Sequence, residues 1–293
     1  IAGALTALAP FYVKFWITTS TAGPYALLGA LALLAAWRGM TSGQPGWLAL
    51  SGALVGLAGL TRADAPLLLA AIALAAIWPG RDAAPMRRRA LVLGLAMAGL
   101  AYMAVMAPWL AHNWKTTGRP FGAGGLQSLF LRSYDDLYSY GQRIDLWGYL
   151  DWGWPAILRS KLDAAGANLL TVIGTWLSFF LAPFAALELW RRRRETLARL
   201  AGGYLLLLYA VMTLLFTFPG PRGSLLHSGA ALLPLLAPFS VHGLERAVEW
   251  IAGRRASWDP LGASRVFGAG AVALSALLAC LLYVQAIQGP RGW

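Results

Sequence analysis

The stretch from Leu200 to Gly229 reads LAGGYLLLLYAVMTLLFTFPGPRGSLLHSG and contains both features that decide the fold. A long uncharged run ends at Phe218, and Arg222 follows inside a Gly-Pro turn. A second apolar run then carries the pair His227 and Ser228. An isolated guanidinium costs about 2.5–3.5 kcal/mol near the centre of a bilayer and less toward its edge. Arg222 is therefore expected at a membrane face, facing either lipid phosphate or an anion in a wet cavity.

Comparable apolar runs recur along the chain, which is 58% hydrophobic and only 12% charged. A bilayer is spanned by a helix of about 20 apolar residues, and a backbone in lipid must satisfy its own hydrogen bonds. The sequence thus predicts an all-α, polytopic transmembrane bundle of about eight or nine helices. The runs of spanning length are Phe15–Trp37, Gly39–Thr61, Ala90–Trp114, Ala164–Leu187, Leu200–Pro221 and Val266–Pro290.

The charge and cysteine content exclude several other classes of protein. The net charge of +12 comes from arginines between apolar runs, with no basic domain, so no nucleic-acid partner is expected. The single cysteine, Cys280, allows neither a disulfide framework nor a cysteine metal site. Gly-rich phosphate loops, nucleophile elbows and zinc-protease motifs are also missing from the sequence, which removes the standard soluble-enzyme mechanisms. We expect no cofactor and assign no metal site, and the sequence leaves open only a divalent cation.

The positions of the basic residues predict the orientation of the helices. If the helices alternate across the membrane, most short-loop arginines fall on one side, which the positive-inside rule makes cytoplasmic. The turns around Arg62 and Arg222 and a long loop then face outward. The arginines assigned to the cytoplasmic side are Arg38, Arg81, Arg87, Arg88, Arg89, Arg191, Arg192, Arg193, Arg194, Arg199, Arg246, Arg254, Arg255 and Arg265.

The chain divides into three parts on this basis. Residues 1–111 and 166–293 are expected to be transmembrane helices, and residues 112–165 an extracytoplasmic loop with an interfacial helix from Pro155 to Leu170. Trp147, Trp152 and Trp154 belong at a lipid–water boundary. We therefore expect this loop to form a cap on the outer face of the bundle, in a multi-pass protein of the cell membrane.

A second outward break follows the apolar run that ends at Thr61. Arg62 and Asp64 lie two residues apart, and Pro66 suits the first turn of the next helix. They could simply pair and cap helix ends. Alternatively, Arg62 binds a phosphate, for which its planar and permanently charged fork is suited, while Asp64 orients an acceptor or a second basic group.

The long loop and its entry carry further polar groups. Asp135 and Asp136 could act as a general base, hold a divalent cation, or form an exposed acidic turn. His112 and Asn113, at the end of a helix, could line a headgroup site or be a solvated helix end.

Taken in order, these stretches resemble the membrane core of a GT-C-fold glycosyltransferase of the protein O-mannosyltransferase and aminoarabinose-transferase type. The resemblance covers about residues 1–240 and depends on the order of its motifs. Those motifs are Gly56-Leu-Ala-Gly-Leu-Thr-Arg62-Ala-Asp64, Pro108-Trp109, His112-Asn113, Gly118-Arg119-Pro120 and His227-Ser228-Gly-Ala-Ala-Leu-Leu-Pro234.

The resemblance implies transfer of a sugar from a polyprenyl-phosphate donor to an acceptor on the outer face, with the bilayer and the donor as partners. It implies donor-phosphate binding by Arg62, Arg222, Ser224 and Ser228, and catalytic roles for Asp64 and His227. Acceptor or sugar contacts would come from Asp135, Asp136, His112 and Asn113. The catalytic base of such enzymes lies in a first outer loop, which we expect before Ile1. The turn at Thr18–Pro24 lacks the carboxylate that the family often has there.

Two other functions remain compatible with the sequence. A transporter or flippase for lipid-linked glycans would also use outer arginines and a large interfacial loop, but the chain shows neither an intramembrane ionisable relay nor an obvious inverted repeat. A non-catalytic membrane scaffold is the third interpretation.

The predicted orientation can be tested by cysteine labelling. In a background without Cys280, a membrane-impermeant thiol reagent added outside should modify a cysteine at position 135 and leave one at position 191 unlabelled, because only the former faces outward. The reverse pattern would overturn the orientation.

Overall fold

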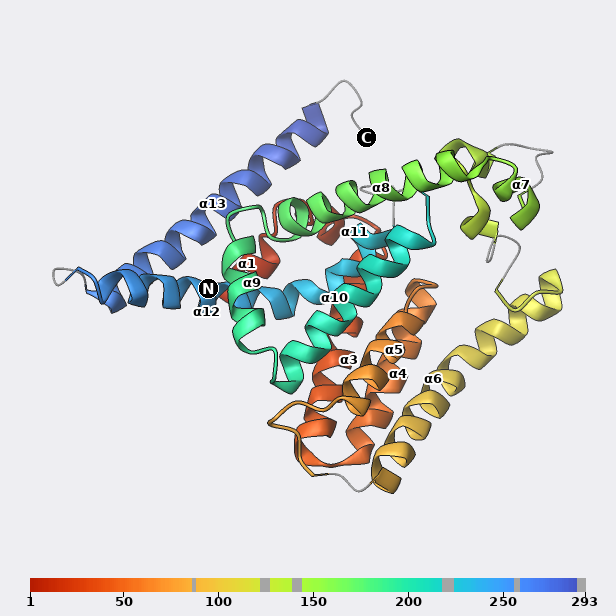
Figure 1. The fold of residues 1–293 in the computed structure, drawn as a ribbon, viewed down its shortest axis with the longest axis horizontal. Helices are drawn as coiled ribbons and strands as arrows, with labels where there is room; N and C mark the ends of the chain where they lie inside the picture. Colours follow the sequence, from red (N-terminus) through yellow and green to blue (C-terminus); the bar gives the residue numbers. More distant parts are fainter. Residues whose placement is uncertain (86–87, 122–126, 139–143, 218–223, 256–258, 289–293) are drawn as a thin grey trace.

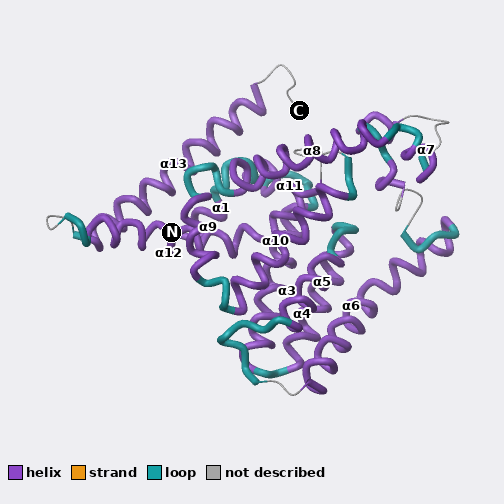
Figure 2. The backbone as a smooth tube through the Cα atoms, in the orientation of Figure 1, coloured by secondary structure: helices purple, strands orange, loops and turns teal. Residues whose placement is uncertain are grey.

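The computed structural model describes residues 1–85, 88–121, 127–138, 144–217, 224–255 and 259–288. Every regular element in these ranges is helical (Figures 1 and 2), as the length of the apolar runs predicts. The all-α class is therefore confirmed for the part of the chain that the structure describes.

The helices vary widely in length. The α-helices are α1 (Ala2–Ala7), α2 (Val13–Trp16), α3 (Ala22–Ser42), α4 (Pro45–Thr61), α5 (Pro66–Ile77), α6 (Arg88–Thr117), α7 (Leu146–Leu150), α8 (Trp154–Leu170), α9 (Ala182–Arg191), α10 (Thr196–Leu214), α11 (Ser224–Ser228), α12 (Leu233–Ala252) and α13 (Pro260–Gln288). Short 3-10 turns are η1 (Gln127–Phe130), η2 (Tyr134–Tyr138) and η5 (Gly229–Leu232), and η3 (Thr171–Trp176) is a π-helical turn.

Four helical segments of the described chain are long and apolar enough to cross a membrane. They are α6, α10, α13 and the continuous stretch Ser224–Ala252, which comprises α11, η5 and α12. In Figure 1, α6, α10 and α13 run along a similar diagonal. The shorter apolar helices α4 and α5 pack among them. A count of eight or nine spanning helices stays a prediction.

The outer helices expose large apolar side chains, whose contact with water would be unfavourable. Leu100 of α6 and Val266 of α13 are each 70% exposed, and large apolar neighbours continue along both helices. Exposed apolar surface costs about 25 cal/mol per Å² in water, whereas hydrocarbon surroundings remove that cost. These faces are therefore suited to contact lipid.

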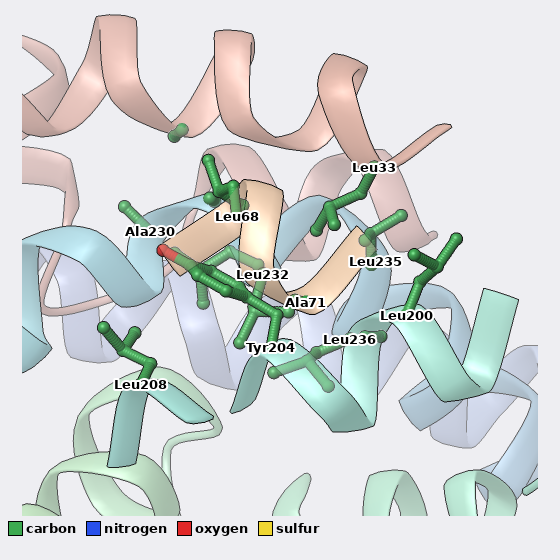
Figure 3. Packing of buried hydrophobic residues seen from close by; sticks show 14 of the residues in the cluster. Leu33, Leu68, Ala71, Leu200, Tyr204, Leu208, Ala230, Leu232, Leu235 and Leu236 are labelled. Carbon is green, nitrogen blue, oxygen red and sulfur yellow. The ribbon is translucent and has the colours of Figure 1, made fainter. Parts of the chain in front are cut away.

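The core lies where α3, α5, α10 and the α11–α12 segment meet. Figure 3 shows Tyr204 of α10 among leucines that include Leu33 of α3, Leu68 of α5 and Leu232 of η5. All four side chains are fully buried. Because a buried tyrosine needs a partner for its hydroxyl, this apolar core also directs Tyr204 toward a polar site, described below.

Glycine allows the closest helix contacts. A Cβ at Gly52 of α4 would lie 2.0 Å from the carbonyl oxygen of Ala98 of α6, and one at Gly229 would lie 1.8 Å from the Trp176 ring. Small residues at such crossings let helix backbones approach, which is the usual basis of helix packing in membranes. Larger side chains at either glycine would force α6 or Trp176 away.

Two apolar segments of the chain form interrupted helices. The apolar start of the chain forms α1 and α2 with a break around Pro10, because proline lacks an N–H and disfavours helical geometry in the residue before it. The expected span Ala164–Leu187 divides into the end of α8, η3 and α9, with Ser178 and Phe179 at φ of 50° and 58°. Left-handed residues end a helix, so this segment turns sharply before α9.

Loops distant in sequence meet at one end of the bundle. The backbone N–H of Arg81 donates to the Arg194 carbonyl (2.7 Å), and the Arg81 guanidinium pairs with Glu195 (2.9 Å). The Asp82 carboxylate accepts from the backbone N–H and the hydroxyl of Thr196, both at 2.7 Å, and so caps the start of α10. The α5–α6 and α9–α10 loops are therefore joined at one arginine-rich end of the bundle, and the side of a membrane that this end faces stays a prediction.

The helix predicted from Pro155 to Leu170 is present as α8, which begins one residue earlier, and its interfacial position stays a prediction. Its Lys161 ammonium donates to the Phe216 carbonyl (3.0 Å), and its Asn168 amide donates to the Thr213 hydroxyl (3.0 Å). These bonds hold α8 against the end of α10, near the top of Figure 1. The cap as a whole, residues 112–165, and the three-part division of the chain stay predictions.

The Asp82 cap gives a pH-dependent contribution to stability. Partial burial alone would raise the pKa of Asp82, but the hydrogen bonds from Thr196 outweigh it and hold the pKa below its usual value. The stabilisation is therefore complete above the pKa of the unfolded chain, about 3.9, and is lost as the pH falls through the lower folded-state pKa.

Replacing Asp82 with alanine should lower the free energy of unfolding by about 1 kcal/mol at pH 7, because α10 loses its cap. Thermal unfolding in detergent measures the loss, which should shrink in acid. Asp163→Ala is the control, since that exposed carboxylate has no hydrogen bond in the described ranges. Equal losses from both substitutions would contradict the capping role.

Candidate functional site

The polar end of the bundle is built on the break between α4 and α5. Arg62 ends α4 in an extended conformation (φ −150°, ψ 133°), while its N–H still donates to the Ala58 carbonyl (2.9 Å). Pro66 starts α5 at a position where its missing N–H costs nothing. Helix α4 therefore stops at Arg62, and the guanidinium leaves the helix axis.

Arg62, Asp64 and Ser228 form one hydrogen-bonded cluster. Arg62 Nε lies 3.2 Å from Asp64 Oδ1 and 2.9 Å from Ser228 Oγ, and Arg62 Nη2 lies 3.2 Å from Asp64 Oδ2. The Ser228 hydroxyl also donates to Asp64 Oδ2. The Arg62 and Asp64 side chains are only 14% and 12% exposed. Two segments far apart in sequence thus meet at a nearly buried ion pair.

One nitrogen of the Arg62 guanidinium is left over. Nη1 has no hydrogen-bond partner among the described residues, whereas Nε and Nη2 are both engaged. Asp64 and Ser228 therefore fix the direction of the fork while leaving a donor for a further acceptor. An arginine held in this way can bind an anion without losing much side-chain entropy.

Two tyrosines support this cluster, and the sequence alone did not identify them. The Tyr25 and Tyr204 hydroxyls are 2.9 Å apart, and Tyr204 donates to the Ser228 carbonyl (3.3 Å). The Arg62 guanidinium lies 5.9 Å from the centre of the Tyr25 ring, within cation–π range. Each tyrosine stands within a mainly apolar run of the sequence. This could have indicated a polar site in the core, since a buried hydroxyl requires a hydrogen-bond partner.

His227 lies next to Ser228 and contacts a different group of residues. Its ring meets the Phe15 ring edge-on, with centroids 5.1 Å apart, and the Lys14 ammonium lies 5.0 Å from the Phe15 centroid. His227 Nδ1 is buried and has no hydrogen-bond partner in the described chain. Lys14 and His227 therefore add basic groups beside the Arg62 cluster. Lys14, like the two tyrosines, was not among the site residues predicted from the sequence.

Two cavities meet at Arg62. The larger, of about 750 Å³, includes Asp64 and Ser224 and is otherwise lined mainly by apolar residues of α5 and α10. Ser128 and Leu129 of η1 close one side of it. The smaller, of about 330 Å³, extends toward α6. The residues common to both are Thr61, Arg62, Ala63 and Pro66.

The structure brings together only part of the predicted site. The lining of the larger cavity includes Arg62, Asp64 and Ser224. Ser228 is hydrogen-bonded to Asp64, and His227 is its neighbour in the chain. Arg222 falls in residues 218–223, outside the described ranges, so its convergence with Arg62 stays a prediction.

The predicted acceptor residues lie elsewhere. His112 and Asn113 are near the end of α6, where the Asn113 amide donates to the Pro120 carbonyl (3.2 Å). Asp136 lines a separate cavity of about 340 Å³ in the long loop, with Trp147 and Asp151. Among the described residues, neither of these groups lines the two cavities at Arg62.

Asp136 organises its own loop. Its carboxylate accepts from the backbone N–H groups of Arg132 (2.8 Å) and Ser133 (3.0 Å) and from the Ser133 hydroxyl (3.0 Å). Partial burial would raise the pKa of Asp136, but these hydrogen bonds outweigh it and lower the pKa below its usual value. The carboxylate is therefore ionised at neutral pH and already engaged, which fits a turn-forming role better than that of a general base.

Within the described ranges, no three His, Cys, Asp or Glu side chains come together as metal ligands. Asp135 and Asp136 thus have no third ligand of these types for a divalent cation in the part of the chain that the structure covers.

Comparison with known proteins does not place the chain in a family: no family model matches it, and neither a curated protein nor a solved structure matches it.

The ion pair can be tested by paired substitution. Arg62→Leu should reduce the free energy of unfolding by about 3 kcal/mol, because Asp64 is left nearly buried without its cation. The double variant Arg62→Leu/Asp64→Leu should be more stable than Arg62→Leu alone, since it leaves no uncompensated charge. Unfolding in detergent measures both, and additive losses would contradict the coupling.

Proposed function

We propose that the chain is an integral-membrane glycosyltransferase of the GT-C type that transfers a sugar from a polyprenyl-phosphate donor. The observation that carries the proposal is the position of Arg62, at the junction of two cavities with mainly apolar linings. A polyprenyl phosphate combines an anionic head with a long apolar chain. A fixed cation beside apolar surface matches both parts of such a ligand.

Arg62 would bind the donor phosphate through its free Nη1 donor. Asp64 and Ser228 serve this role by holding the other edge of the guanidinium, at the distances given above. Neighbouring donors for the phosphate are the Ser224 hydroxyl, on the lining of the larger cavity, and the His227 ring. The charge-assisted hydrogen bond from arginine is the strongest of these contacts.

The chemistry that this arrangement supports is displacement at the anomeric carbon. An acceptor hydroxyl gives its proton to a general base and attacks that carbon, the bond from carbon to the phosphate oxygen breaks, and the polyprenyl phosphate leaves with the bonding electrons. The resemblance assigns that base to an acidic residue of a first outer loop. Negative charge grows on the phosphate as the bond breaks, so a preorganised guanidinium in a partly dry cavity stabilises the transition state more than the ground state.

The apolar surfaces have a separate role. Leu67 of α5 and Val211, Met212, Leu215 and Phe216 of α10 and its C-terminal end line the larger cavity and would contact the first prenyl units. Their contact is with atoms that do not react, so it contributes to binding more than to the rate of the chemical step.

The central experiment measures sugar transfer from a radiolabelled polyprenyl-phosphate donor in reconstituted vesicles. Transfer to an acceptor supports the enzyme, movement of the intact donor across the bilayer without transfer supports a transporter, and neither activity supports a scaffold. The last two outcomes would each overturn the glycosyltransferase proposal.

Two substitutions test the location of the donor site. Arg62→Lys should weaken donor binding about tenfold, because lysine keeps the charge but loses the planar fork. Val211→Trp should block binding by filling the larger cavity without changing any charge. Leu206→Trp, on the exposed side of the same helix α10, is the matched control and should bind normally. Equal binding by the two tryptophan variants would place the donor elsewhere.

A further inference from the structure

A separate cavity of about 320 Å³ opens between the start of the chain and the last helix, α13. Its lining combines apolar side chains, such as Phe11 and Leu282, with Lys14, Tyr283 and Gln285. None of the residues on its lining belongs to the two cavities at Arg62. It is therefore a distinct site within the described chain.

The three polar groups of this cavity have no partners within the described part of the protein. No hydrogen bond or ion pair joins the Lys14 ammonium, the Tyr283 hydroxyl or the Gln285 amide to another described residue. An ammonium group without an ion-pair partner beside apolar surface is destabilising. A bound anion would therefore stabilise the protein by pairing with it. Ammonium, phenol and amide are all hydrogen-bond donors, which suits a phosphate oxygen.

Lys14 is also held in position. Its ammonium lies 5.0 Å from the Phe15 ring centroid, and its carbonyl accepts from the Thr18 hydroxyl (2.7 Å). The contact with Phe15 fixes the direction of the side chain without neutralising its charge. The cation is therefore available to a ligand and restricted in its motion.

The lining of the cavity also fits the start of an acyl chain. Phe11, Val13 and Leu282 supply apolar surface next to its polar groups. Polar groups at the end of a long apolar helix occupy the depth at which lipid headgroups lie.

We propose that this cavity binds an anionic phospholipid of the surrounding bilayer. The lipid phosphate accepts hydrogen bonds from Lys14, Tyr283 and Gln285, while the first part of the acyl chains contacts the apolar lining of the cavity. The net negative charge of the headgroup selects it over a zwitterionic lipid, because only the anionic lipid leaves Lys14 fully compensated. The site does not depend on the proposed sugar transfer.

Photocrosslinking can locate the lipid. The full chain is reconstituted with diazirine-bearing phosphatidylglycerol or phosphatidylcholine at equal concentration, and labelled peptides are mapped by mass spectrometry. Adducts on residues 279–288 should be about fivefold more abundant with phosphatidylglycerol, since one lysine contributes about 1 kcal/mol toward an anionic lipid. Lys14→Gln should bring the ratio near one, and Lys14→Arg should keep it. Lys115→Gln, an exposed lysine at the end of α6, should leave it unchanged.

A second variant fills the cavity and keeps the charge. Ala286→Trp should reduce phosphatidylglycerol adducts on this segment to the phosphatidylcholine level even if Lys14→Gln fails to fold. Either of two results would overturn the proposal: equal labelling by the two lipids in the unaltered protein, or full phosphatidylglycerol labelling in Ala286→Trp.

Discussion

The contact between Arg62, Asp64 and Ser228 is the interaction on which the polar end of the molecule depends. It joins the α4–α5 break to the start of the helical stretch that continues into α12. A guanidinium and a carboxylate beside apolar helices are each costly alone, and they become tolerable only when they compensate each other. The need to satisfy them therefore fixes how these two segments meet, and Tyr25 and Tyr204 extend the same network into the core.

The opposite end is held by a different set of contacts. Arg81 and Asp82 bind the turn before α10, so charged groups join the loops while α5 and α10 remain apolar between them. Hydrocarbon surroundings favour this separation, because a polar group at a helix end can reach water or a partner and one at the centre cannot. The Arg62 cavities and the Lys14 cavity accordingly lie beside helix breaks and helix ends.

The proposed donor site combines a fixed cation with mainly apolar surroundings. Arginine alone does not distinguish a ligand site from a structural ion pair, and in this protein Arg62 forms the ion pair and is also the residue proposed to bind the ligand. Two of its nitrogens, Nε and Nη2, donate hydrogen bonds to Asp64 and Ser228, and the third has no hydrogen-bond partner among the described residues. A lipid-linked phosphate suits that combination better than a free anion would, since the cavity linings beyond Arg62 are mainly apolar.

The sequence alone determined the helical class, the breaks at Arg62 and Pro66, and the helix that begins near Pro155, because length, polarity and proline act locally. It also marked Arg62, Asp64 and Ser228 as polar exceptions within apolar runs. Only the tertiary structure paired Ser228 with Arg62, separated Asp136 from them, and added Tyr25, Tyr204 and Lys14. It also showed that the chain turns near Ser178, whereas the continuous apolar sequence there predicts one unbroken helix. Each of these depends on which helix faces come together, and packing between distant segments leaves no periodic signal in the chain.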